Sequence, residues 1–293
     1  MNFNLFMLDK NIISLIQSIN NGEAIKKDNK DHIEMIQFLR RHDKRIYNFS
    51  YLSSAIEGRN KIKENKSQSI NTVNHEANVL SSFFKKARTD GNMLKGNKYE
   101  FSEVFSKNNH LSDEIKIKAI FKKYYELREK YECKISIPKQ LQEPIAFELL
   151  SYIESQGVNK ENPIISIIFL KIYQLKDQNI KVDPTGVINL KKKKSIDENI
   201  HNIYSDLYIP NLIAKIEYEA KKYANFKIKF LTLDKALKSY IDIFKITIVD
   251  EIKTNQFYKN WNSIEVEITS KTIREFLKKL FEKWESHKVT IVE

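Results

Sequence analysis

The chain has 293 residues, and its 50 Lys and Arg outnumber 38 Asp and Glu, which gives a formal net charge of +12. A hydrophobic fraction of 41% excludes disorder of the whole chain and is enough for one large domain or two of ordinary size. The single cysteine, Cys133, excludes an internal disulfide framework and a cysteine-based zinc cluster. The excess of positive charge favours a polyanionic partner such as nucleic acid.

The apolar residues are not distributed as a secreted or membrane protein would need. The first apolar run, 3–8, is too short for a signal peptide, and no later run reaches the ~20 apolar residues of a transmembrane helix. Together with the lone cysteine, this pattern predicts a cytoplasmic protein without membrane contact. Because the chain has only 6 Gly and 5 Pro, we expect long helices joined by polar loops.

The first predicted elements are a strand, a turn and several helices. An apolar run ends in Asp9, and the residues after it have helical spacing as far as Gly22. Helices are also predicted over 33–39 and 46–56, and the second of these would place Glu57 at its C-terminal end. The spacing over 70–87 predicts a further helix.

The middle of the chain is predicted to be a helical block. The stretch 89–112 is polar and irregular, which is typical of a boundary or an insertion, and helical spacing then covers 115–131, 138–157 and 163–173. This pattern divides the chain into an N-terminal part of a core (1–88), a helical insertion (89–180), and a C-terminal part of the core with a terminal helix (181–293).

The last third contains a second apolar run that ends in an aspartate and leads into a helix-like pattern, as at Asp9. A turn signal at 182–187 predicts a small hairpin, and helical spacing follows over 200–216, where Pro210 kinks one helix or separates two. The apolar run 227–233 then ends in Asp234 and leads into a helix-like pattern. Two strands, over 244–249 and 264–268, and a terminal amphipathic helix are also predicted.

Asp9 and Asp234 are the main candidates for a functional site. Open α/β sheets build their sites at the carboxyl ends of their strands, so two strands in one parallel sheet would bring these carboxylates to the same edge. Crowded carboxylates repel, and they stay ionised together only when a cation neutralises them. Mg²⁺ and Mn²⁺ prefer such oxygen ligands. The sequence therefore predicts a metal site that acts on a polyanion.

At these residues the chain resembles the PIN-domain ribonucleases. Members of that family carry an aspartate that closes the first strand, a glutamate on a following helix, an aspartate at the start of a later helix, and another in a Thr-x-Asp sequence that closes a strand. The matching stretches here are Leu8-Asp9-Lys10-Asn11, the segment with Glu57, Ser205-Asp206-Leu207-Tyr208 and Thr232-Leu233-Asp234. The resemblance covers roughly the first 60 residues and the segment 195–250. It implies Asp9, Glu57, Asp206 and Asp234 as catalytic residues, with Asp9, Asp206 and Asp234 as metal ligands.

The resemblance also implies a fold and an activity. The fold would be a helix-rich α/β fold with a PIN-like central parallel sheet flanked by helices and interrupted by the helical insertion. The activity would be Mg²⁺- or Mn²⁺-dependent cleavage of RNA that leaves 5′-phosphate and 3′-hydroxyl ends. The lysines nearest in sequence for contacts with substrate phosphates are Lys10, Lys235, and Lys191 and Lys192 in the run 191–194. By analogy, we expect a growth-arresting toxin or a phage-defence effector that an inhibitory or activating protein partner controls.

Each of these features also has a structural explanation. Asp9 and Asp206 could be helix caps, and the run of four lysines could be a solvated loop. A non-catalytic protein, whose basic helical block binds nucleic acid or another protein, is therefore the alternative, and a PIN-like fold that has lost its metal is a third possibility. The spacing of the histidines argues against a zinc hydrolase, and 91–98 lacks the Ser or Thr of a phosphate-binding P-loop.

Overall fold

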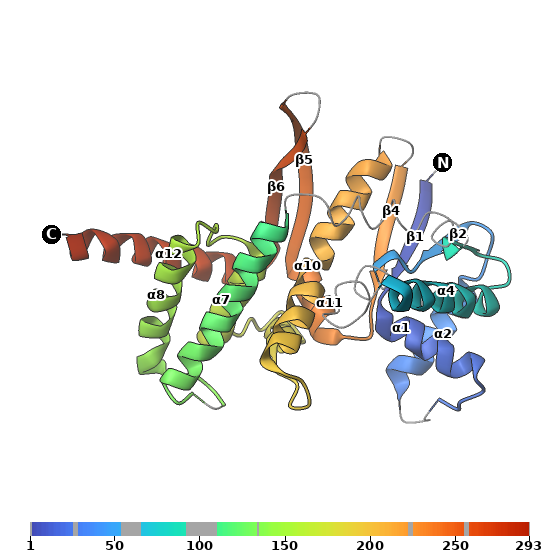
Figure 1. Ribbon diagram of the computed structural model, residues 1–293, viewed down its shortest axis with the longest axis horizontal. Helices are drawn as coiled ribbons and strands as arrows, with labels where there is room; N and C mark the ends of the chain where they lie inside the picture. Colours follow the sequence, from blue (N-terminus) through green and yellow to red (C-terminus); the bar gives the residue numbers. More distant parts are fainter. Residues whose placement is uncertain are drawn as a thin grey trace. The chain divides into compact units, whose positions relative to one another are not determined.

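The computed structural model describes residues 2–25, 29–53, 66–91, 110–133, 135–221, 225–254 and 258–292. Within these ranges the chain is an α/β protein with a four-stranded parallel sheet, a two-stranded antiparallel sheet and many helices (Figure 1). The strands are β1 (Asn2–Leu8), β2 (Tyr47–Ser50), β3 (Arg88–Thr89), β4 (Asn225–Leu231), β5 (Phe244–Thr254) and β6 (Tyr258–Ile268). The helices are α1 (Lys10–Asn20), α2 (Lys30–Arg41), α4 (Lys66–Phe83), α7 (His110–Lys130), α8 (Lys139–Ser155), α9 (Pro163–Ile172), the 3₁₀ helix η1 (Pro184–Ile188), α10 (Ile196–Lys221), α11 (Lys235–Ile243) and α12 (Lys271–Val292).

The chain forms two compact units, and each is built from two separate segments. The first unit comprises residues 1–108 and 211–235 and contains the parallel sheet. The second comprises residues 109–210 and 236–293 and contains the antiparallel pair β5–β6. The boundary at 210 falls within α10, so this helix contributes residues to both units.

The parallel sheet has the strand order β3-β2-β1-β4. β1 pairs with β4 along its whole length, from Asn2 opposite Asn225 to Leu8 opposite Leu231, and Figure 1 shows the two strands side by side. The prediction that the runs ending in Asp9 and Asp234 lie together in one parallel sheet is confirmed. Because the last residues of both strands are opposite each other, the residues that follow them emerge at the same edge.

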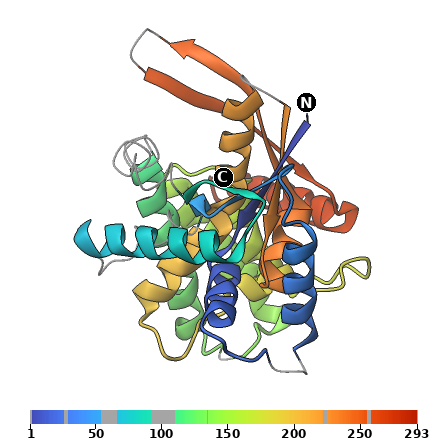
Figure 2. The same ribbon diagram turned by 90° about the vertical axis from the view of Figure 1, so that its right-hand side faces the viewer.

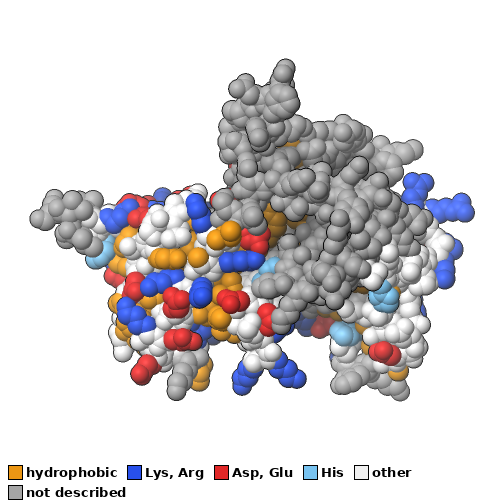
Figure 3. Space-filling view, in the orientation of Figure 1, with side chains coloured by type: hydrophobic (Ala, Val, Ile, Leu, Met, Phe, Trp, Pro, Cys, Tyr) orange, Lys and Arg blue, Asp and Glu red, His pale blue; other side chains and the backbone are white. Residues whose placement is uncertain are grey.

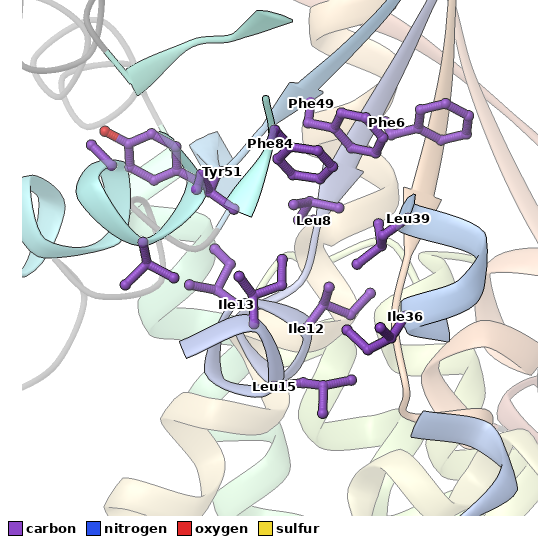
Figure 4. Packing of buried hydrophobic residues seen from close by; sticks show 14 residues of the cluster. Phe6, Leu8, Ile12, Ile13, Leu15, Ile36, Leu39, Phe49, Tyr51 and Phe84 are labelled. Atoms are coloured by element: carbon purple, nitrogen blue, oxygen red, sulfur yellow. The ribbon is translucent and has the colours of Figure 1, made fainter. Parts of the chain in front are cut away.

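The core of the first unit lies between one face of the sheet and the helices α1, α2 and α4, which Figure 2 shows beside the strands. Phe6 stacks on Phe49 with 5.1 Å between ring centroids, and Phe49 stacks on Phe84 at 4.1 Å, so the rings join β1, β2 and the end of α4 (Figure 4). Fully burying each such ring contributes roughly 1.5–3 kcal/mol.

The helix α1 follows β1 directly and supplies the next part of this core. It buries Ile12, Ile13, Leu15 and Ile16, whose spacing places them on one side of the helix. Just beyond its end, Gly22 has φ +78°, a left-handed conformation that glycine adopts without a steric penalty. The apolar face therefore fixes where α1 lies, and with it the turn that contains Asp9.

The second unit is built mainly from helices. α9 is buried at almost every position, and Asn162 caps it by accepting a hydrogen bond from the Ile164 N–H at 2.9 Å. α12 buries several of its side chains, among them Ile273 and Trp284. The indole N–H of Trp284 donates a hydrogen bond to Glu154 on α8 at 2.9 Å. No helix in the described parts of the chain combines the length and apolar character that crossing a bilayer requires.

Two predicted elements are wrong. Residues 47–50 form the strand β2 where a helix over 46–56 was predicted, because Phe49 packs between two aromatic rings and pairs with β1. Where a hairpin was predicted, η1 forms because Asp183 accepts hydrogen bonds from the N–H and hydroxyl of Thr185 and so caps the turn. At Pro210, where the alternatives were one kinked helix or two separate helices, the structure has the single helix α10. Glu57 lies outside the described residues.

Candidate functional site

Polar residues follow each strand of the parallel sheet at its carboxyl end. Asp9 follows β1, Ser50 closes β2, Asp90 follows β3, and Thr232 and Asp234 follow β4. Because all neighbouring strands are parallel, these residues belong to one edge of the sheet, which we call the acidic edge. This is the edge at which open α/β sheets place their sites.

Asp9 is buried, with only 5% of its surface exposed. One carboxylate oxygen, Oδ2, accepts hydrogen bonds from the Thr232 hydroxyl at 2.5 Å and from the Asn11 amide nitrogen at 2.5 Å. Asp9 occupies the N-cap position of α1, but its side chain makes none of the usual capping hydrogen bonds. The backbone N–H of Lys10, the first residue of α1, does hydrogen-bond the Asp9 carboxylate, so Asp9 contacts the start of the helix as well as Thr232 and Asn11.

Burial is the main reason that the pKa of Asp9 is raised above its ordinary value. The nearby carboxylate of Asp234 raises the pKa further by charge repulsion, while the hydrogen bonds from Thr232 and Asn11 act in the opposite direction. The folded chain has thus brought Asp9 and Asp234 within electrostatic reach of each other, as the sequence predicted. Asp234 itself is exposed, so the pair joins an inner carboxylate to one at the surface.

Asn11 and Thr232 hold the two strand ends together. The Asn11 amide donates to the Thr232 hydroxyl oxygen at 3.1 Å and accepts from the Leu233 N–H at 3.1 Å, and the Thr232 hydroxyl oxygen also accepts from the Asp234 N–H at 2.9 Å. The position of Asp9 relative to the turn that carries Asp234 is therefore fixed by side chains. Sequence reasoning did not identify Asn11 or Thr232 as site residues, although both lie two positions from a predicted aspartate.

The structure places Asp206 differently from the sequence prediction. Asp206 lies in the middle of α10, which begins at Ile196, so the prediction that it starts a helix is wrong. The helix starts earlier because Ser195 and Glu198 cap it: the Ser195 hydroxyl accepts from the Glu198 N–H at 3.2 Å, and Glu198 accepts from the Ser195 N–H at 3.0 Å. Asp206 belongs to the second unit and is not among the residues that the parallel sheet itself brings together.

The lysines predicted to contact phosphate divide between the two units. Lys10 and Lys235 are the first residues of α1 and α11 and belong to the first unit. Lys235 is exposed and forms an ion pair with Asp31 at 2.7 Å. Lys191 and Lys192 are exposed in the segment before α10, in the second unit.

Asp90 is a member of the acidic edge that the sequence analysis missed. It accepts hydrogen bonds from the Ser50 hydroxyl and from the Tyr51 N–H, the latter at 3.3 Å, and so ties β3 to the end of β2. Burial raises the pKa of Asp90 to about 6. The sequence signal that could have found it is an aspartate after a strand, but β3 has only two residues and shows no periodicity.

Beside Asp90 lies a buried tyrosine. Tyr51 is fully buried, and its hydroxyl has no hydrogen-bond partner in the described part of the chain. Burial raises the pKa of Tyr51, and the nearby carboxylates of Asp90 and of Glu76, a buried residue of α4, raise it further. The Tyr51 phenol therefore stays protonated at neutral pH.

The donor set of the acidic edge is small but suits magnesium. Among the described residues, no group of three or more His, Cys, Asp and Glu side chains is arranged to hold a metal ion, which leaves the pair Asp9 and Asp234. Mg²⁺ commonly binds through one or two carboxylates and completes its coordination with waters and substrate phosphates. A cation would also relieve the repulsion that helps to raise the pKa of Asp9.

Comparisons of the chain with protein-family models, with curated proteins and with solved structures found no match.

Proposed function

We propose that the protein is a Mg²⁺- or Mn²⁺-dependent ribonuclease, with Asp9 and Asp234 as metal ligands at the acidic edge. The observation that carries this proposal is the register of β1 and β4, whose last residues, Leu8 and Leu231, are opposite each other. The register places a buried and an exposed carboxylate near each other, and the second raises the pKa of the first. The net charge of +12 supports a polyanionic substrate such as RNA.

The residues of the site have different tasks in this proposal. Asp9, held by Asn11 and Thr232, is a ligand of fixed orientation, and the exposed Asp234 is the ligand nearer to the substrate. When bound, a divalent cation supplies an activated water and neutralises charge on the phosphate. Lys10 is a candidate for a phosphate contact, and Lys235 would exchange its exposed ion pair with Asp31 for a substrate phosphate.

Other parts of the proposal come from the resemblance to the PIN-domain ribonucleases. That resemblance adds Glu57 to the catalytic residues and implies products with 5′-phosphate and 3′-hydroxyl ends. It also names Asp206, although α10 begins at Ile196 and so does not give Asp206 the helix-start position on which that match was based. It also implies a role as a toxin or a phage-defence effector under the control of a protein partner.

The decisive experiment measures RNA cleavage during titration with MgCl₂ or MnCl₂. We expect Asp9→Asn and Asp234→Asn each to lower the cleavage rate at least about 100-fold, since even residues that only support metal ligands cost 10–100-fold when they are changed. The matched control is Asp242→Asn, an exposed aspartate of α11 in the second unit, which should cleave at the unchanged rate.

Two outcomes would contradict the proposal. Full cleavage by both Asp9→Asn and Asp234→Asn would remove these residues from the chemistry. RNA binding without cleavage at any concentration of either metal would favour the non-catalytic binding protein instead.

A further inference from the structure

The second unit exposes a run of four lysines whose charge has no partner in the described chain. Residues 189–197 are all exposed, and they include Lys191–Lys194, which lead into α10. None of these four ammonium groups forms an ion pair with a described carboxylate. Figure 3 shows blue Lys and Arg side chains projecting at the lower end of α10. We call Lys191–Lys194 the lysine turn.

The lysines of α12 give a direct comparison within the same unit. There each of four lysines lies close to a glutamate and has its charge balanced. The pairs are Lys271 with Glu275, Lys278 with Glu282, Lys283 with Glu143, and Lys288 with Glu154. The lysine turn therefore differs from these four lysines of α12, because none of its ammonium groups is paired with a described carboxylate.

The backbone of the lysine turn is held in place by one buried side chain. Asn199 is only 4% exposed, and its Oδ1 accepts from the Lys191 N–H at 2.8 Å. Its amide nitrogen lies within hydrogen-bonding distance of the carbonyls of Lys191 and Lys194 at 3.2 Å and of Ser195 at 3.0 Å. The Lys194 N–H also donates to the Lys191 carbonyl at 3.1 Å, which closes the turn. A ligand that binds here meets an ordered backbone, so the entropy cost of ordering that backbone is reduced.

The end of α10 does not itself supply an anion site. Ser195 and Glu198 satisfy each other's N–H groups, and the first turn already contains two acidic residues, Asp197 and Glu198. The negative charge of these carboxylates offsets the positive end of the helix dipole, so the helix end does not attract a further anion. The lysine side chains are therefore the feature that attracts an anion.

We propose that the lysine turn binds the phosphate backbone of RNA, separately from the acidic edge and without a metal ion. Lysine ammonium groups on flexible stems bind phosphates as point charges, and several adjacent ones suit a repeating backbone. A membrane surface fits less well, because the exposed apolar residues that flank the turn, Leu190 and Ile196, are two separate side chains and not the continuous apolar face that binds a bilayer. The choice of RNA rests on the proposed function, whereas the binding surface does not.

The test measures binding of the whole chain to a labelled single-stranded RNA in EDTA, where metal-dependent cleavage does not occur, at several salt concentrations. The variant replaces Lys191, Lys192, Lys193 and Lys194 by glutamine. If all four contact phosphates, the slope of log K against log salt should become shallower by about 2.8, since each contact to a single strand contributes about 0.7. Raising the salt fourfold would then weaken the unaltered chain about 50-fold more than the variant.

The matched control removes the same charge from α12, through Lys271→Gln, Lys278→Gln, Lys283→Gln and Lys288→Gln. We expect it to keep a slope closer to that of the unaltered chain, because those lysines are paired with glutamates. Equal slopes for the two fourfold variants would overturn the proposal, since binding would then follow net charge alone. The proposal would also be overturned if the variant of the lysine turn kept the RNA slope of the unaltered chain but lost binding to phosphatidylserine vesicles.

The outcome can be separated from that of the nuclease proposal. Asp9→Asn and Asp234→Asn should bind RNA in EDTA with the unaltered salt slope, whether or not they cleave RNA when metal is added. An RNA slope that depends on Asp9 and not on the lysine turn would place binding at the acidic edge and contradict the separation of the two surfaces.

Discussion

The acidic edge shows how much depends on two short polar side chains. Thr232 donates its hydroxyl proton to Asp9 and accepts from Asn11 and from the Asp234 N–H. The Asn11 amide nitrogen donates to Asp9, and its amide oxygen accepts from the Leu233 N–H, so Asn11 bridges the ends of β1 and β4. A buried donor or acceptor that loses its partner bears the full cost of desolvation, so this network is more sensitive to deletion than an exposed one.

Thr232→Val removes the hydroxyl while keeping the shape of the side chain. We expect it to lower the free energy of unfolding by about 1–3 kcal/mol, because Asp9, Asn11 and the Asp234 N–H each lose a hydrogen bond. Urea unfolding followed by circular dichroism measures the change. Thr247→Val, at an exposed position of β5, is the matched control and should change stability by less than about 0.5 kcal/mol. Similar losses in the two variants would show that the network is not stabilising.

Asp90 predicts a specific dependence of stability on pH. Its pKa is raised by burial from 3.8 to about 6, so the folded state holds the proton more tightly than the unfolded state. The stability from this group is complete below pH 3.8 and is lost as the pH rises through about 6. Relative to that of Asp90→Asn, the free energy of unfolding of the unaltered chain should therefore fall by up to about 3 kcal/mol over that interval, since one pKa unit corresponds to about 1.4 kcal/mol.

The measurement for Asp90 is urea unfolding of the chain and of Asp90→Asn at several pH values across this interval. Because asparagine cannot ionise, the variant supplies the reference for all other titrating groups. Two curves that stay parallel with pH would show that Asp90 titrates normally in the folded chain.

At the scale of elements, sequence patterns predict those that are long or clearly periodic. The helices α7, α8 and α9 and the strands β1 and β4 lie where the spacing predicted them, because each buries a continuous apolar run or one face. β2 was missed because residues 46–56 have helical spacing, and a four-residue strand in a parallel sheet shows too little alternation to outweigh it.

The sequence identified a site residue where it also predicted the strand or helix that positions this residue. Asp9 and Asp234 follow long apolar runs, so the sequence identified them, and their meeting needed only the assumption of one parallel sheet. Asp90 follows a strand of two residues, and its hydrogen bonds with Ser50 and Tyr51 depend on β2, the strand that was mispredicted. Asp206 was placed at a helix start because its sequence fits one, but α10 begins ten positions earlier, at Ile196, where Ser195 and Glu198 cap it.

The assignment of β2 can be tested with two neighbouring substitutions. A helix over 46–56 would put Ile46 and Phe49 on the same buried side, so both changes to alanine would be costly. In the strand, Phe49 is fully buried whereas Ile46 is 68% exposed. We therefore expect Phe49→Ala to cost about 3–5 kcal/mol and Ile46→Ala to cost little. Comparable losses in urea unfolding would contradict the strand.

The whole molecule combines two chemically different surfaces in its two units. The acidic edge belongs to the first unit and the lysine turn to the second, and α10 runs through the boundary between the units. In the proposed nuclease, the acidic edge would supply the chemistry and the lysine turn would bind the substrate backbone. The sequence-based division at 88 and 180 stays a prediction, whereas the structure divides the chain at 108, 210 and 235.

The pairing of β1 with β4 joins residues as far apart as Asn2 and Asn225. During translation the chain emerges from its N-terminus, so β1 exposes an unpaired edge until β4 has left the ribosome. Asp9 precedes its partner carboxylate by 225 positions (234 minus 9), so the two meet only after the whole segment between them has been made. Under the proposed function, a chain whose synthesis stops before Asp234 would lack the assembled carboxylate pair and would not cleave RNA.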